Sequence, residues 1–247
     1  MIKFFRKIRQ NLLMENKTGK YLKYAIGEIV LVMIGILLAL QINNWKEESQ
    51  NRRYENTMLK EVKKALVVDL KNIKNNISYL KKVKYSIHEI TRMKNDSLNQ
   101  QDSLYEHLDF IDGYGANFII NKSPFKAIES SGLDRISNTE IRNALSKLYG
   151  YRIESAENFI NEVMRNELFK RNDLKEEIFG YNIVARDENN IVNKLVIENF
   201  ETVLKHPKMD YFLYTSGWPL SRTIRLLETV EGQMNELKKL IETEFNK

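Results

Sequence analysis

The three histidines are the side chains best suited to bind a metal ion, but they lie far apart in the chain. They are His88, His107 and His206, and no two of them have the short helical spacing that lets a pair share one ion. Glu106 and Asp109 flank His107, but adjacent residues on a helix point in different directions. We therefore expect structural or solvated histidines and no bound metal.

Familiar catalytic motifs are absent from the sequence. It contains no G-x-S-x-G motif, no Walker-type phosphate loop, no G-x-G-x-x-G motif and no cysteine. Gly113-Tyr114-Gly115 lacks the third glycine, and Ser130-Ser131-Gly132 has the composition of a helix end. Carboxylates mostly alternate with lysines, as they do on solvated helix faces. These patterns predict no catalytic residue, no cofactor and a non-enzymatic protein.

One aromatic group could contribute to binding rather than to catalysis. It consists of Tyr211, Phe212, Tyr214 and Trp218. Packing in a core is the commoner use of clustered rings, and a ligand groove is the alternative. The segment 209–218 that carries them could be a strand or a loop packed on the rest of the domain.

The stretch Tyr24–Ile42 is the long, nearly uncharged apolar run of this chain, and it predicts a transmembrane helix over residues 24–44. Its nineteen residues span roughly 28 Å as a helix, close to the hydrocarbon thickness of a bilayer. Tyr24 and Trp45 bracket the run, as aromatic residues do at membrane interfaces. The lipid bilayer is therefore the first expected partner.

The residues before this run form a basic arm, residues 1–23. Seven Lys/Arg stand there against one acid, and Ile2, Phe5, Ile8 and Leu12 recur at helical spacing, which predicts an amphipathic helix on an anionic membrane surface. Residues 4–23 carry six Lys/Arg and residues 43–62 carry four. This bias predicts a single-pass protein of the inner membrane, with a cytoplasmic N terminus and a periplasmic C-terminal domain.

Four residues inside the apolar run are candidates for helix contacts. Gly27, Gly35 and Ala39 share one face, which would allow another helix to approach closely, although small residues are common in membrane helices. Glu28 is costly inside a bilayer. It predicts either a partner contact or ion path, or a carboxylate that reaches back to the headgroups.

Two segments resemble a known family. Phe4–Trp45, FFRKIRQNLLMENKTGKYLKYAIGEIVLVMIGILLALQINNW, resembles the N-terminal signature of a family of short bacterial single-pass membrane proteins of unknown function. The match includes the FRKIRQNLL, KYLKYAIGEI and GILLALQINNW parts, and a weaker likeness covers Phe125–Ile136, FKAIESSGLDRI. The resemblance implies the membrane topology and a helical character, and it supplies no catalytic residue.

Residues 45–247 are expected to form one exported, all-α domain. Nothing breaks a helix between Ala39 and Tyr105, and a seven-residue apolar repeat predicts one long helix from about Trp45 to Lys94. The repeat comprises Leu59, Leu66, Ile73, Leu80 and Ile87. A second, less regular apolar line is interrupted by Asp69 and Asn76, which favours the first helix of a bundle over a coiled-coil stalk.

Further helices follow from capping signals and apolar spacing. One is expected from Ser123 to Gly132, and a second should open at Ser137 and Glu140 with capping-box spacing and run to Leu168 or beyond. Two more are predicted at 191–205 and 221–245.

The formal charge of +6 is concentrated before the apolar run, so the sequence does not predict a nucleic-acid partner. The sequence favours a membrane-anchored structural or interaction component of a bacterial cell-envelope assembly, as a homo-oligomer or with other envelope proteins. The alternative is a membrane-anchored helical domain that senses a ligand or binds a solute.

Overall fold

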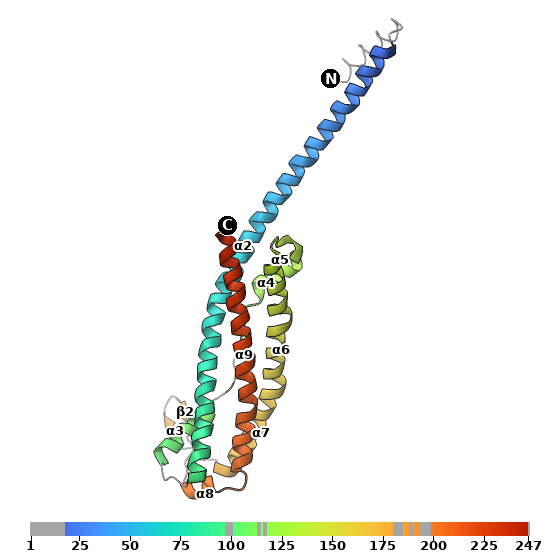
Figure 1. The fold of residues 1–247 in the computed structure, drawn as a ribbon. Coiled ribbons are helices and arrows are strands. Elements are labelled where there is room, and N and C mark those ends of the chain that lie inside the picture. The colour runs from blue at the N-terminus through green and yellow to red at the C-terminus, as the bar shows by residue number, and fades with distance from the viewer. Residues whose placement is uncertain are drawn as a thin grey trace. The chain divides into compact units, whose positions relative to one another are not determined.

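The structure is a computed structural model that describes residues 18–96, 101–112, 115, 118–179, 185–187, 190–192 and 199–246. The chain divides into two compact units between Asn56 and Thr57. Figure 1 shows the elements of each. We describe the two units separately.

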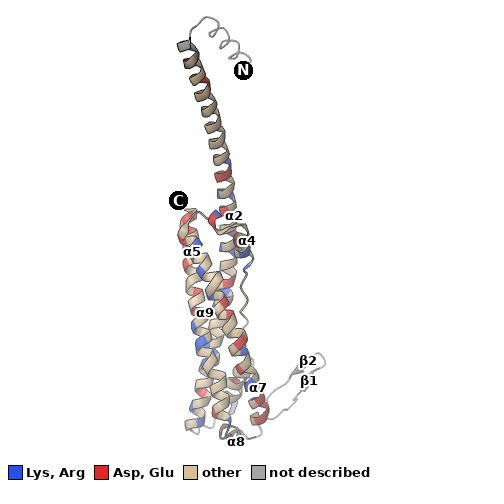
Figure 2. Ribbon diagram, turned by 90° about the vertical axis from the view of Figure 1, so that its right-hand side faces the viewer, with Lys and Arg blue, Asp and Glu red and all other residues tan. Residues whose placement is uncertain are grey.

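The first long helix, α2, extends from Thr18 to Asp96 and crosses the division between the units without interruption. This confirms the long first helix, which the sequence predicted from the absence of Gly and Pro between Ala39 and Tyr105. Between Ala25 and Ile42 the sequence of α2 has one charged residue, Glu28, and Figure 2 shows the part of α2 within the first unit mostly without charged residues.

The second unit is a helical bundle of three long helical stretches (Figure 1). The later part of α2 is the first stretch, residues 139–179 form the second, and α9 is the third. The elements after α2 are α3 (Gln101–Asp112), α4 (Ser123–Ser131), η1 (Leu133–Arg135), α5 (Thr139–Lys147), η2 (Leu148–Arg152), α6 (Ile153–Asn158), η3 (Phe159–Met164), α7 (Arg165–Phe179), β1 (Ala185–Asp187), β2 (Asn190–Val192), α8 (Phe200–Leu204) and α9 (Met209–Phe245).

The apolar seam of α2 lies in the core of this bundle. Four members of the seven-residue repeat are at most 1% exposed, and Ile87 is half-buried. The second apolar line is buried too, which fits a helix that packs against two neighbours better than a two-stranded zipper. The bundle interpretation of α2 is therefore confirmed.

The second stretch contains two π-helical turns, η2 and η3. In η2 the consecutive residues Leu148 and Tyr149 are both buried, and the next buried position is Ile153. The wider π turns adjust the helix phase, so that residues before and after them face the same core.

Ion pairs fix the antiparallel register of α2 and α9. Lysines of α2 meet carboxylates of α9 in reverse order along the two helices. The pairs are Lys63–Glu242 (3.0 Å), Lys74–Glu231 (3.8 Å), Lys81–Glu228 (2.7 Å) and Lys94–Asp210. Each exposed pair contributes little alone, but a shifted register would lose them together.

The aromatic segment 209–218 is neither a strand nor a loop, because it forms the first turns of α9. Pro219 lies inside this helix and cannot donate to the carbonyl of residue 215. The Ser216 hydroxyl donates to the Phe212 carbonyl at 2.7 Å, and buried Phe212 and Leu220 hold both sides of the proline in the core. Tertiary packing therefore keeps the chain helical at Pro219, where the sequence alone predicts a helix boundary.

The helix expected at 191–205 is confirmed at its end by α8 (Phe200–Leu204) and is wrong at its start, while residues 193–198 lie outside the described part of the chain. Asn190–Val192 forms β2, which pairs antiparallel with β1 so that Arg186 faces Ile191. A short helix, α8, begins only at Phe200, after Asn199 caps it by accepting from the Thr202 N–H at 3.1 Å. Apolar spacing does not distinguish this hairpin from a helix.

The opening of α5 differs by one residue from the predicted capping box. Asn138, not Ser137, is the N-cap, and its side-chain oxygen accepts from the N–H groups of Glu140 (2.9 Å) and Ile141 (3.3 Å). Both residue types favour this position, so the sequence alone does not choose between them.

Candidate functional site

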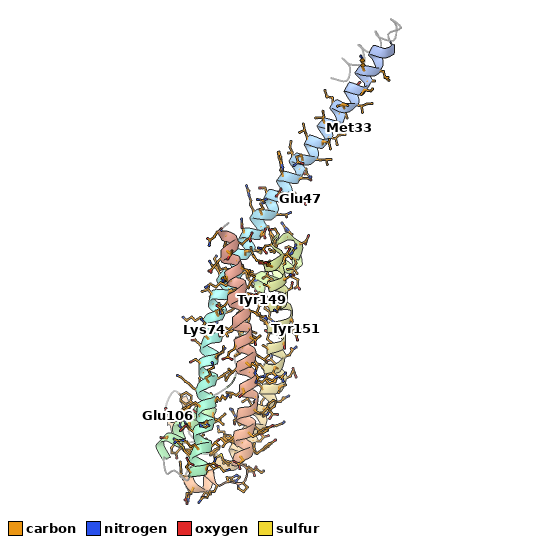
Figure 3. All side chains as sticks on the ribbon, in the orientation of Figure 1. Met33, Glu47, Lys74, Glu106, Tyr149 and Tyr151 are labelled. Carbon is orange, nitrogen blue, oxygen red and sulfur yellow. The ribbon has the colours of Figure 1, made fainter. Side chains whose placement is uncertain are left out.

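The apolar part of α2 in the first unit presents a continuous apolar surface. Its large apolar side chains between Ile26 and Ile42 are each 47–62% exposed, and Figure 3 shows Met33 among them. Soluble proteins rarely expose so large an apolar surface. Within the described part of the chain, one helix is long and apolar enough to cross a membrane.

The four predicted contact residues lie on this part of α2. A Cβ added at Gly27 or Gly35 meets no atom within 4 Å, and Ala39 is exposed, so their shared face is open to an approaching helix. Glu28 is partly buried. A helix contact at these positions stays a prediction.

In the second unit, Trp218 is the centre of a polar and aromatic cluster between α9 and the second stretch. Its indole Nε1 donates to Glu167 Oε2 at 3.1 Å, and Lys170 Nζ donates to the same carboxylate at 2.7 Å. Phe159 meets the indole edge-on with 6.4 Å between ring centroids, and the Arg222 guanidinium lies 4.9 Å from the Phe159 ring centre. These contacts join α9 to α7 and η3.

The electrostatics of this cluster favour positioning over proton transfer. The hydrogen bond from Lys170 is the largest cause that lowers the pKa of Glu167; burial opposes it, and the indole N–H lowers the pKa further. The same hydrogen bond raises the pKa of Lys170. A general acid or base at neutral pH needs the opposite shifts, so both groups stay charged and hold each other in place.

The structure separates the four aromatic residues of the predicted groove. Tyr211, Tyr214 and Trp218 are 50%, 61% and 37% exposed, and the two tyrosine rings stack with centroids 6.4 Å apart. Phe212 is 3% exposed and packs edge-on against Phe179 in the core. Three rings are thus available at the surface of α9, while the fourth anchors the helix.

A buried carboxylate, Asp69, forms a second polar site inside the bundle. It is 3% exposed and accepts from the Asn121 backbone N–H at 3.1 Å, which ties the irregular segment 118–122 to α2. Burial raises the pKa of Asp69, and the hydrogen bond from Asn121 partly offsets this. In the sequence, Asp69 interrupts the second apolar line of α2. An acid at a position where apolar residues recur is the signal by which the sequence indicates a buried carboxylate.

Tyr149 of η2 lies close enough to this carboxylate to feel its charge. Its ring stacks on Phe125 of α4 with centroids 4.9 Å apart. Burial raises the pKa of the Tyr149 hydroxyl, and the negative charge of Asp69 raises it further. The hydroxyl therefore stays protonated at physiological pH, and the cluster joins α2, α4 and η2 structurally.

The histidines serve local structure. His107 Nδ1 lies 3.1 Å from Ser86 Oγ, with the Tyr85 ring edge-on to the imidazole. His206 Nδ1 accepts from the Lys208 N–H at 3.2 Å in the turn before α9, and His88 is exposed. Among the described residues, no three His, Asp or Glu side chains gather closely enough to hold a metal ion.

Together these observations define an all-α protein: a helical bundle preceded by a long apolar helix. The chain belongs to a family of unknown function, DUF6090, whose model matches residues 28–168. The match covers α2 from Glu28 onward and most of the second stretch, and it includes the segment Phe125–Ile136. No curated protein and no solved structure shows significant similarity to the chain.

Proposed function

We propose that this protein is a membrane-anchored, non-enzymatic structural or interaction component of a bacterial cell-envelope assembly. The observation that carries the proposal is the exposed apolar surface of α2 between Ile26 and Ile42, joined in one chain to a folded bundle. A bilayer would cover that surface, and the helix satisfies its own backbone groups there.

The charge distribution supports the orientation. Residues 4–23 carry six Lys/Arg and residues 43–62 carry four, which favours a cytoplasmic N terminus and a periplasmic bundle at the inner membrane. The polar clusters around Glu167 and Asp69 join helices to one another, which suits a scaffold that presents surfaces to partners.

A pair of double variants tests membrane anchoring. Leu37→Lys/Leu38→Lys places two charges in the apolar segment, where each costs about 2.5–3.5 kcal/mol at the centre of a bilayer. The matched control is Val67→Lys/Val68→Lys, which changes two neighbouring valines that are 50% and 60% exposed on the bundle part of α2. We expect the first variant to leave the membrane fraction and the control to stay there. Equal partitioning of the two would contradict the proposal.

Protease accessibility tests the orientation separately. In spheroplasts, added protease should degrade the bundle, and in inverted membrane vesicles the bundle should be protected. Protection in spheroplasts would place the bundle in the cytoplasm and reverse the proposed topology.

The exposed tyrosines and Trp218 favour a second candidate function, the binding of a small ligand by an anchored sensor or solute-binding domain. The chain has two tryptophans, so Trp45→Phe leaves Trp218 as the single indole reporter. A saturable change in Trp218 fluorescence, with a raised melting temperature, would support a ligand at this surface. A screen of envelope solutes that changes neither would reject it in favour of the interaction role.

A further inference from the structure

A groove lies on the outside of the bundle between α2 and α9. Its volume is about 490 Å³, which is in the range of small-molecule sites, and it opens widely to solvent. The lining residues are Lys74, Ile77, Ser78, Lys81, Lys82 and Tyr85 of α2, with Glu231 of α9. Figure 3 labels one of them, Lys74. We call this hollow the lysine groove.

Helical spacing brings the lining residues of α2 together. Side chains four residues apart are neighbours on a helix surface, and the six residues form two adjacent columns with this spacing. The columns are Lys74, Ser78 and Lys82, and Ile77, Lys81 and Tyr85. The groove is therefore built from one side of α2, and α9 contributes its other wall.

Hydrogen-bond donors outnumber acceptors in the lysine groove. Lys74 Nζ lies 3.8 Å from Glu231 Oε1, which is beyond hydrogen-bond distance, so its ammonium keeps its donors for another acceptor. Ser78 and Lys82 have no hydrogen bond or ion pair with any other described residue. Among the described residues, Glu231 alone contributes a carboxylate to the lining. The groove thus suits a ligand that is rich in acceptors.

The charge around the groove is positive. Between Asp69 and Glu89, α2 contains five lysines and no acid. The second wall supplies Glu231 and, next to the groove, Glu228, which pairs with Lys81 at 2.7 Å. These two carboxylates do not balance five lysines, so the local field attracts an anion.

The groove also has an apolar part. Ile77 is 6% exposed and forms its floor, and the ring of Tyr85 is 59% exposed. That ring meets His107 of α3 edge-on with 5.9 Å between the ring centroids, so a second helix holds it in place. The methylene groups of the lysines extend the apolar surface. A ring or a short carbon chain of a ligand can pack against this part.

We propose that the lysine groove binds a small organic anion. The phosphate, sulfate or carboxylate group of this ligand accepts from Lys74, Ser78 and Lys82, and its carbon part packs against the ring of Tyr85. The groove is a different surface from that of Trp218, which contacts α7 and η3. The proposal adds a ligand to the interaction role, and it requires only the folded bundle, so a failure of membrane anchoring would not affect it.

Protection of lysines from acetylation is the first test. The full chain in micelles of a nonionic detergent is treated briefly with acetic anhydride at constant ionic strength, and mass spectrometry follows each lysine. Phenyl phosphate is the probe, because it combines an acid group with a ring. At saturation it should slow the acetylation of Lys82 at least about threefold. Lys60 and Lys126, which are exposed and lie outside the groove, should react as before.

Two related probes separate the acid group from the ring. Inorganic phosphate should protect Lys82 only at higher concentration, and benzamide, a neutral ring, should not protect it. Equal potency of phosphate and phenyl phosphate would contradict the apolar part of the proposal. Absence of saturable protection at Lys82, or equal slowing at Lys60 and Lys126, would overturn the proposal as a whole.

A lipid headgroup carries the same acid chemistry as a free small molecule. The experiment is therefore repeated with phosphatidylglycerol in the micelles and without phenyl phosphate. We expect Lys82 to react at its full rate. Protection by the lipid alone would assign the groove to a membrane surface and overturn the small-molecule proposal.

Substitutions in the groove provide the second test, with calorimetry of phenyl phosphate binding to the full chain. Ser78→Ala/Lys82→Gln removes a hydroxyl and a charge and should weaken binding at least about fivefold. Lys82→Arg keeps the charge and should retain most of the affinity. The matched control is Lys60→Gln, which removes an exposed lysine of the same helix outside the groove.

Circular dichroism of each variant checks that the helices remain. If the double variant loses helical structure, Lys82→Gln alone gives the same comparison with Lys60→Gln. Equal affinity of the groove variant and the control would show that phenyl phosphate does not bind at Lys82, and the proposal would be wrong.

Discussion

Gly132 ends α4 with a backbone φ of 99°, which side chains other than glycine rarely adopt. A Cβ at this position would also collide with the Asp134 carboxylate. Gly132→Ala should therefore lower the free energy of unfolding by about 1–3 kcal/mol, measured by chemical denaturation. Gly232 of α9 is the matched control, because an added Cβ there meets nothing within 4 Å. Gly232→Ala should stabilise by about 0.5–1 kcal/mol, and equal effects of the two changes would contradict this account.

Asp69 predicts a specific pH dependence. Its pKa is raised in the folded state because burial disfavours the charged form, so the folded protein binds the proton more tightly than the unfolded chain. The free energy of unfolding should therefore decrease as pH rises from the ordinary aspartate pKa to the raised pKa, and this contribution should be constant above it.

The variant Asp69→Asn keeps an acceptor for the Asn121 N–H and removes the buried charge. It should be more stable than the unmodified chain at pH 7, and the difference should vanish at a pH below both pKa values. Asp69→Leu serves as the comparison, because it removes the acceptor too and leaves the Asn121 N–H without this partner. Thermal melts across pH measure both, and a pH-independent difference for Asp69→Asn would exclude the buried charge as its cause.

Residue-scale features differ in how far the sequence reveals them. A glycine after Ser130-Ser131 predicts a helix end, and Gly132 confirms it, because a local backbone conformation selects the residue. Asp69 lies 52 residues from Asn121, and no local pattern identifies the partner of a buried acid.

At the scale of the element, the start of α5 is sensitive to its N-cap. Asn138→Ala removes the acceptor for two backbone N–H groups and should lower the free energy of unfolding by about 1–2 kcal/mol. Ser137→Ala, which changes the residue that the sequence alone selects, should have a smaller effect. Denaturation of the two variants side by side decides between the caps, and a larger loss for Ser137→Ala would contradict the structure.

Element boundaries were predictable where local signals agree with packing and wrong where they conflict. The first helix has a sustained apolar repeat without Gly or Pro, and α2 confirms it. Segment 209–218 contains Gly217 and is followed by Pro219, yet burial of Phe212 and Leu220 keeps it helical. The predicted helix at 191–205 was wrong at its start, where strand pairing replaces it, and right at its end, where α8 begins after the cap at Asn199.

For the whole molecule, the division at Asn56 and Thr57 predicts that residues 57–247 fold without the apolar segment. The core cluster begins at Leu59 and lies entirely within this unit. The fragment should be water-soluble, show the circular dichroism of a helical protein and unfold cooperatively. A fragment that is unfolded or aggregated under conditions where the full chain is folded in detergent would show that the bundle depends on the apolar part of α2.

The sequence by itself determined the long apolar helix, the all-α class and the buried seam of α2, because hydrophobic periodicity and the absence of helix breakers act locally. It also pointed to the family through residues along that helix. Only the tertiary structure decided that Trp218 donates to Glu167, that Asp69 accepts from Asn121 and that Lys81 of α2 pairs with Glu228 of α9. These relations join residues distant in the chain, and they follow from the register in which three helices share one core.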